Sequence, residues 1–198
     1  TQAWEELYKM TYPRAYAVAV QTMKNREDAL DVLQEAYISV FKNIDSLQDE
    51  TKLNAWVSRI VGNRCIDYLR KYRGKNEPTL FGEMISDDSD VEFEDILEND
   101  NQEFIPEESV DYGETKKIMQ GILDQLPDEQ RLCVLMYYYD ELSVKEIAET
   151  LGCSTGTVKS RLNYARKYIK KEVEKQEKKG TKLYSIAPIS FLIWMLHS

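Results

Sequence analysis

The stretch from Leu142 to Arg166 carries the local signals of two helices joined by a tight turn. Ser143 and Glu146 have the spacing of a capping box, which starts a helix. Gly152 suits the left-handed backbone conformation that often ends a helix, and Ser154 can cap the helix that follows. Together these signals predict a helix-turn-helix.

The two faces of the second predicted helix differ in chemistry. At about 100° per residue, four apolar side chains recur on its inner face: Val158, Leu162, Ala165 and Ile169. The outer face and its flanks carry hydroxyl, amide and basic groups, which can bind base edges and phosphates. These residues are Thr157, Lys159, Ser160, Arg161, Asn163, Tyr164, Arg166, Lys167 and Lys171. The pattern indicates a helix that reads duplex DNA; the alternative is a solvated helical hairpin with an ordinary charged face.

The net charge of −9 argues against DNA binding until the acidic residues are located. From Glu77 to Glu114 there are fifteen Asp and Glu residues and no Lys or Arg. The rest of the chain has 26 basic and 20 acidic residues, a net charge of +6. Because the acidic charge is concentrated in one segment, the remainder can still attract nucleic acid.

Sparse glycine and proline, together with these shifts in composition, predict an all-α protein of two small helical domains joined by a flexible acidic linker. The expected segments are a helical domain at 1–76, the acidic linker at 77–113, the helix-turn-helix domain at 114–179 and an apolar extension at 180–198. The apolar run Ile186–Leu196 is shorter than the roughly 20 residues of a transmembrane helix. No signal peptide is recognised, so we expect no transmembrane segment and a cytoplasmic location.

Histidine and cysteine usage argues against metal and histidine-based catalytic sites. His197 is the only histidine, and Cys65, Cys133 and Cys153 lack the paired spacing of zinc ligands or disulfides. We expect the cysteines to be buried or half-buried in a reducing compartment. No positioned base, nucleophile or phosphate-binding glycine loop is recognised. The sequence therefore predicts no metal, no cofactor and no enzymatic activity.

A helix of the N-terminal domain is predicted to begin near Arg26. Its apolar face would consist of Leu30, Leu33, Tyr37, Val40, Phe41 and Ile44. The opposite face carries Asp28, Asp31, Glu35 and Lys42, with Gln34 at its edge. Taken alone, such charges indicate no more than a solvated helix face.

The next predicted helix, from about Lys52 to Tyr72, has a basic side. That side contains Arg59, Asn63, Arg70 and Arg73, and Trp56 lies near its border with the apolar face. A basic helix with an aromatic edge can follow a phosphate backbone and stack an unpaired base. The alternative is a solvated basic helix end with Trp56 in the core.

In this order, the segments resemble the bacterial sigma factors of the extracytoplasmic-function (ECF) group. The resemblance rests on Asp31–Lys42, Ala55–Lys71, Leu126–Arg131 and Ser143–Arg166, and it covers roughly residues 5–75 and 114–173. It implies an initiation factor that binds core RNA polymerase and directs promoter-specific transcription by reading and opening promoter DNA. The polymerase would supply the phosphoryl-transfer chemistry.

The resemblance also implies roles for individual residues. Asp31, Gln34 and Glu35 would bind the clamp helices of the polymerase large subunit. The minus-ten element would be read and opened by Trp56, Arg59, Asn63, Arg64, Asp67, Arg70, Lys71 and Arg73, and a flipped base would enter a pocket in the loop at about 45–52. The minus-thirty-five element would be read by Thr157, Lys159, Ser160, Arg161, Asn163, Tyr164, Arg166 and Lys167.

Three further expectations concern the acidic linker, the apolar tail and a protein partner. An acidic linker can act as a nucleic-acid mimic in the polymerase or as a plain solubilising spacer. The apolar tail would dock on this chain or on the polymerase, with a membrane surface as the alternative. Members of the group are commonly held by an anti-sigma factor, although nothing in the sequence identifies one.

Two other functions account for parts of the sequence. A helix-turn-helix transcriptional regulator that does not replace a sigma factor would explain Ser143–Arg166 but not Trp56 and the basic helix around it. A protein-interaction module that masks polymerase would leave the basic face from Lys159 to Lys171 unexplained.

Overall fold

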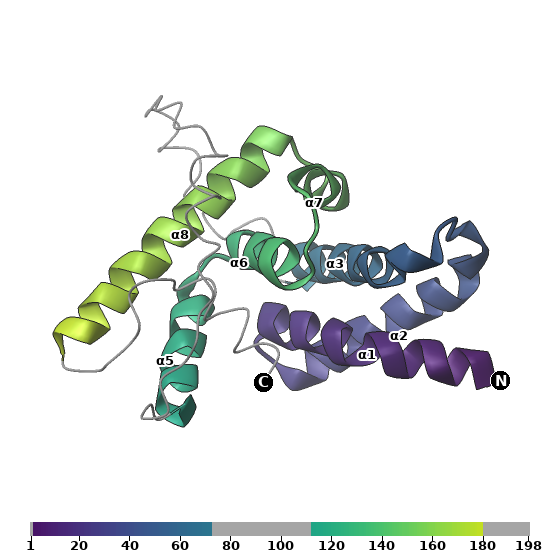
Figure 1. Cartoon of the computed structure of the whole chain (residues 1–198), viewed down its shortest axis with the longest axis horizontal. Helices are drawn as coiled ribbons and strands as arrows, with labels where there is room; N and C mark the ends of the chain where they lie inside the picture. The colour runs from purple at the N-terminus through teal and green to yellow at the C-terminus, as the bar shows by residue number, and fades with distance from the viewer. Residues whose placement is uncertain (1, 73–111, 180–198) are drawn as a thin grey trace.

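The computed structural model describes residues 2–72 and 112–179, and within these ranges it contains helices and no strand (Figure 1). The N-terminal helices are α1 (Gln2–Met23), α2 (Arg26–Asn43) and α3 (Leu53–Tyr72), and short 3-10 turns at Ile44–Ser46 and Glu50–Lys52 connect α2 to α3. The C-terminal helices are α5 (Tyr112–Gln125), α6 (Asp128–Val134), α7 (Val144–Leu151) and α8 (Thr155–Lys178), and α6 continues as a π-helical turn at Leu135–Tyr139. The predicted all-α class is confirmed.

Several expectations concern residues outside the described part of the chain. These are Arg73, nearly all of the acidic linker, and the apolar extension at 180–198. Among the described residues, no helix is long and apolar enough to cross a membrane.

The predicted helix-turn-helix is formed by α7 and α8. The Ser143 hydroxyl accepts a hydrogen bond from the Glu146 backbone N–H at 3.3 Å, and the Ser143 N–H donates to Glu146 Oε2 at 2.9 Å. Gly152 ends α7 with a φ of 62°, a conformation that glycine adopts without a Cβ clash. Ser154 Oγ then accepts from the Thr157 N–H at 3.0 Å and starts α8. The four apolar side chains predicted on the inner face of α8 are all 0% exposed: Val158, Leu162, Ala165 and Ile169.

The buried face of α2 differs from the prediction. Leu30 and Phe41 were expected in the core but are 41% and 39% exposed. The buried face is centred instead on a row that includes Ala29 and Ala36, each 0% exposed. Small side chains in this row let α2 pack closely against α1 and α3, which turns Leu30 and Phe41 toward solvent.

The N-terminal and C-terminal helices share one hydrophobic core. In Figure 1, α7 lies beside α3, and contacts also join α1 to α6. At Gly62, α3 lies so close to the π-helical turn that a Cβ on this residue would clash with Met136 Cε. The fully buried Arg131 of α6 donates to the carbonyl oxygen of Thr22 in α1 at 2.8 Å and forms an ion pair with Asp128. This packing between the two helical groups was not predicted.

The cysteines lie where the sequence predicted. Cys65 and Cys133 are buried, Cys153 is half-buried, and all three are free thiols. Burial raises the pKa of Cys65 to about 12, so its thiol stays protonated at neutral pH.

Candidate nucleic-acid interface

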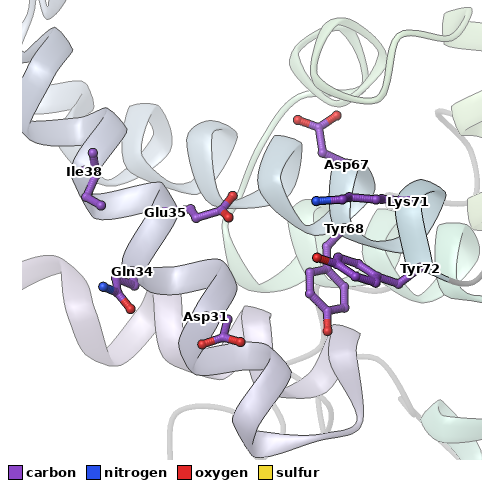
Figure 2. A pocket seen from close by; sticks show the side chains of 8 residues that line it. All are labelled: Asp31, Gln34, Glu35, Ile38, Asp67, Tyr68, Lys71 and Tyr72. Atoms are coloured by element: carbon purple, nitrogen blue, oxygen red, sulfur yellow. The ribbon is translucent and has the colours of Figure 1, made fainter.

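A groove lies between α2 and α3, with a volume of about 320 Å³. Its lining residues from α2 are Asp31, Gln34, Glu35 and Ile38, and those from α3 are Asp67, Tyr68, Lys71 and Tyr72 (Figure 2). The three predicted polymerase-binding residues are all exposed here. The structure thus brings them together with Asp67 and Lys71 of the predicted minus-ten set in one groove, which we call the α2–α3 groove.

Polar contacts between α2 and α3 hold the walls of this groove. The Tyr68 hydroxyl donates to Asp28 Oδ1 at 2.6 Å, and chiefly this hydrogen bond raises the pKa of Tyr68 to about 12. Arg64 Nη2 donates to the Ser39 hydroxyl at 2.9 Å, while its Nη1 lies 3.5 Å from Asp67 Oδ2. Arg64 therefore contacts both α2 and Asp67 at the groove, and its role in DNA binding stays a prediction.

A second cavity lies at the loop that joins α2 to α3, where the sequence predicted a pocket. Its volume is about 230 Å³, and we call it the Trp56 cavity. It is lined by Ser46, Leu47, Gln48, Asp49, Lys52, Ala55, Trp56, Arg59 and Glu146. Asp49 shapes the loop because its carboxylate accepts from the Thr51 N–H at 3.0 Å and from the Thr51 hydroxyl at 2.5 Å, which lowers the pKa of Asp49.

The sequence left two interpretations of Trp56 open: an aromatic edge that can stack a base, or a side chain of the core. The side chain is half-buried and packs on the hydrophobic core, yet it also lines the Trp56 cavity. An aromatic side chain that is fixed on one side and open on the other is suited to stacking an unpaired base.

The rest of the predicted minus-ten set lies on the solvent side of α3. Asn63, Asp67, Arg70 and Lys71 are exposed, and Arg59 and Arg64 are half-buried. Two of these arginines contact α7: Arg59 Nη2 lies 2.9 Å from Glu149 Oε2, and Arg70 Nη2 donates to the Leu151 carbonyl oxygen at 3.3 Å.

On α8, the predicted minus-thirty-five residues differ in accessibility. Lys159, Ser160 and Lys167 are exposed, whereas Thr157, Asn163, Tyr164 and Arg166 are half-buried. Arg161 has a side chain only 11% exposed and forms an ion pair with Glu129 of α6. Burial and the nearby charge of Arg70 lower the pKa of Arg161. The exposed members of the set are therefore better placed than Arg161 to reach DNA.

Sequence reasoning missed several residues of these sites. Ile38 and Tyr72 line the α2–α3 groove, and Glu146 lines the Trp56 cavity from α7. Ile38 and Tyr72 are exposed apolar side chains next to charged positions, which is a usable signal. Glu146 lines the Trp56 cavity only because the two helical groups pack together, so no local feature of the sequence predicts its position there.

Comparison with known proteins identifies the family. The model of Sigma-70 region 2 matches residues 7–75, and that of Sigma-70 region 4 matches residues 116–169. The chain is 30% identical to the ECF RNA polymerase sigma factor SigW of Bacillus subtilis, over 86% of this chain and 89% of SigW. The chain belongs to the ECF sigma factors.

Further relatives agree with this membership. The ECF sigma factor SigM of Bacillus subtilis is 30% identical, over 84% of this chain and 92% of SigM. The sigma-E factor of Escherichia coli is 29% identical, over 85% of each chain. The sigma factor RpoE of Bartonella quintana, solved in complex with the anti-sigma factor NepR, has the same fold. It superposes with a TM-score of 0.58 at 19% identity, covering 88% of this chain and 98% of that one.

As an ECF sigma factor, the protein binds core RNA polymerase and promoter DNA and directs transcription initiation. The membership and function expected from the sequence are therefore confirmed, and a regulator that does not replace a sigma factor is not favoured. The ECF sigma factors are not a class of enzymes. The region 2 match contains the α2–α3 groove and the Trp56 cavity, and the region 4 match contains α7 and most of α8.

Proposed function

We propose that this ECF sigma factor works through two domains with separate tasks. The N-terminal domain at 1–76 binds polymerase and opens the minus-ten element. The domain at 114–179 reads the minus-thirty-five element, and the acidic linker at 77–113 joins the two. The chain supplies recognition and strand opening in the cytoplasm, while polymerase catalyses RNA synthesis. An anti-sigma factor is an expected partner, as NepR is for the Bartonella protein.

The observation that carries this proposal is the Trp56 cavity beside the exposed side of α3. Strand opening needs a place for an unstacked base and cations for the backbone next to it. Trp56 offers the stacking surface, and Asp49 and Gln48 offer polar groups inside the cavity. Asn63, Arg70 and Lys71 continue from it along α3 as an exposed polar and basic row.

The exposed side of α8 supports the minus-thirty-five assignment. Helix-turn-helix proteins place the second helix in the major groove with the first part of that helix at the bases. Lys159 and Ser160 lie in the first two turns of α8 and are exposed, and Lys167 follows at a spacing that keeps it on the solvent side. These three positions are therefore expected to contribute most to DNA affinity.

The α2–α3 groove is the proposed polymerase contact. It is acidic on the α2 side, where Asp31 and Glu35 are exposed, and Ile38 adds an apolar surface that is 46% exposed. A charged rim around an apolar patch is the usual composition of a protein–protein interface.

Separate variants distinguish the α2–α3 groove from the Trp56 cavity. We expect Glu35→Lys to weaken binding to core polymerase, whereas Glu27→Lys, an exposed acid on the same helix outside the groove, should bind normally. Trp56→Ala should bind polymerase normally and fail to open promoter DNA, measured with 2-aminopurine placed in the minus-ten element. The promoters are those found by mapping start sites for the wild-type protein. Normal opening by Trp56→Ala would show that the minus-ten assignment is wrong.

A further inference from the structure

An aromatic surface lies where α1 and α2 pack side by side (Figure 1). The rings of Trp4 in α1 and Phe41 in α2 meet edge to face, with their centroids 5.0 Å apart. The rings of Tyr8 and Tyr37 pair in the same way across the two helices, at 4.8 Å. Two further tyrosines continue the row along α1 at a spacing of four residues, which keeps them on one side of the helix. We call these six residues the aromatic face: Trp4, Tyr8, Tyr12, Tyr16, Tyr37 and Phe41.

The described chain covers the aromatic face only in part. Trp4, Tyr8 and Phe41 are 40%, 39% and 39% exposed, although aromatic rings are among the largest apolar side chains that a protein can bury. Tyr37, in contrast, is 4% exposed, and its hydroxyl lies at hydrogen-bond distance, 2.8 Å, from the hydroxyl of Thr11. The inner ring is therefore fixed in place, while the outer rings present apolar area at the surface.

The aromatic face differs in charge from the two cavities described above. Four of the eight residues that line the α2–α3 groove are charged, as are four of the nine that line the Trp56 cavity. All six residues of the aromatic face are uncharged. Covering charged groups with an apolar segment removes them from water at a cost in free energy. Among these three surfaces, the aromatic face is therefore the one suited to an uncharged apolar segment.

The chain itself contains such a segment after α8. The fourteen residues at 183–196 include no charged side chain, and nine of them are Leu, Ile, Phe, Trp or Met. Leaving so many large apolar side chains in water is unfavourable, so the segment has a strong tendency to bind an apolar surface. It lies outside the described residues, and its attachment point is Lys179 at the end of α8.

The 183–196 segment is long enough to reach the aromatic face. Leu196 follows Lys179 by 17 residues, which span up to about 56 Å when extended. The 22 residues of α1 span about 33 Å, and α6 contacts both α1 and α8. Because the segment is covalently attached, its effective concentration at the aromatic face is on the order of millimolar, which a second copy of the chain would have to match in solution.

We propose that residues 183–196 dock on the aromatic face and cover Trp4, Tyr8 and Phe41. Pro188 suits this surface, because aromatic-lined grooves bind extended segments that contain proline. The docked segment lies on the α1 side of α2, whereas the proposed polymerase contact lies on the α3 side. The docking is therefore independent of the assignments made above for polymerase and promoter DNA.

Site-specific photo-cross-linking in the full-length protein tests this docking. The photoreactive residue p-benzoylphenylalanine replaces Tyr8, so that its ring takes the place of the tyrosine ring on the aromatic face. The control carries the same group in place of Met10, which is 63% exposed on α1 but is not part of the aromatic row. Isotope-labelled and unlabelled protein are mixed in equal amounts, and mass spectrometry then separates cross-links within one chain from those between two chains.

We expect cross-links from position 8 to residues 183–196 of the same chain, about tenfold more abundant than those from position 10. No cross-link from position 8 to this segment would overturn the proposal. Equal abundance from the two positions would also overturn it, because the segment would then contact α1 without preference. Cross-links between two chains would assign the aromatic face to a second copy and would contradict docking within the chain.

Chymotrypsin provides a second measurement, because it cleaves after aromatic residues and Phe191 lies within the segment. Its cleavage rate there reports how often the segment leaves its docking surface. Phe41→Lys places a charge on the aromatic face, and the control Met10→Lys places one on another exposed part of α1. With both variants folded by circular dichroism, we expect cleavage after Phe191 to be about tenfold faster in Phe41→Lys and unchanged in Met10→Lys. Equal rates in wild type and Phe41→Lys would contradict docking.

Discussion

Arg59 of α3 and Glu149 of α7 form an ion pair of 2.9 Å although 90 residues separate them in the chain. The pair joins the two helical groups on their solvent side, since the two side chains are 38% and 49% exposed. Exposed pairs of this kind contribute about 0.2–1 kcal/mol, so this one biases the α3–α7 contact without dominating it.

A double-mutant cycle measures that contribution. We expect the coupling free energy between Arg59→Ala and Glu149→Ala to be below about 1 kcal/mol in urea unfolding, and to fall further at high salt. A coupling above about 2 kcal/mol would mean that the pair is far less solvated than its exposure indicates.

The capping box of α7 offers a prediction about stability. Ser143→Ala removes the hydroxyl that accepts from the Glu146 N–H, so we expect the free energy of unfolding to fall by about 1 kcal/mol. Ser160→Ala, at an exposed position inside α8, is the matched control and should change it by less than about 0.5 kcal/mol. Equal effects would show that the capping hydrogen bonds contribute nothing measurable.

Two glycines should respond to alanine in opposite directions. Gly152 has a φ of 62°, so Gly152→Ala places a Cβ in a strained backbone conformation and should destabilise the protein by about 1 kcal/mol. A Cβ at Gly121, inside α5, meets nothing within 4 Å. Gly121→Ala should therefore stabilise by about 0.5–1 kcal/mol. Thermal unfolding of both variants checks the pair, and a shift in the same direction would contradict the described backbone.

The elements that the sequence predicted well depend on local signals. Ser143, Gly152 and Ser154 each act within a few residues of their own position, and all three have the predicted role. The prediction of the buried face of α2 was less accurate. Leu30 and Phe41 have the spacing of core residues but are exposed. Hydrophobicity alone could not show that the small side chains of Ala29 and Ala36 lie on the buried face.

The contacts between the two helical groups could not be predicted in this way. Glu146 and Glu149 look like ordinary surface acids on α7, and nothing near them in sequence points to Arg59 or to the Trp56 cavity. The same holds for Arg131, whose polar side chain is 0% exposed and donates to the Thr22 carbonyl oxygen across this contact. Long-range packing decides the role of each.

Asp140, at the end of the π-helical turn, makes stability depend on pH. Burial raises the pKa of its carboxyl to about 7, Ser58 and the Arg14 guanidinium 3.5 Å away lower it only in part, and Glu141 raises it. A raised pKa favours the folded protein at low pH. This contribution is complete below the ordinary value of 3.8 and is lost as pH rises toward about 7.

Asp140→Asn removes this titration. Relative to wild type, the variant should gain about 2–3 kcal/mol of stability between about pH 5 and about pH 8, because only wild type is penalised as the buried carboxyl ionises. Urea unfolding at the two pH values gives the difference. A difference between variant and wild type that is independent of pH would contradict the raised pKa.

The central claim is that this chain alone gives core polymerase promoter specificity. It is tested most directly by adding the protein to sigma-free core polymerase on fragmented genomic DNA and mapping RNA start sites. We predict starts preceded by a common two-part sequence, lost with Trp56→Ala and reduced with Lys159→Ala. Starts without a common upstream sequence, or no starts at all, would contradict the account.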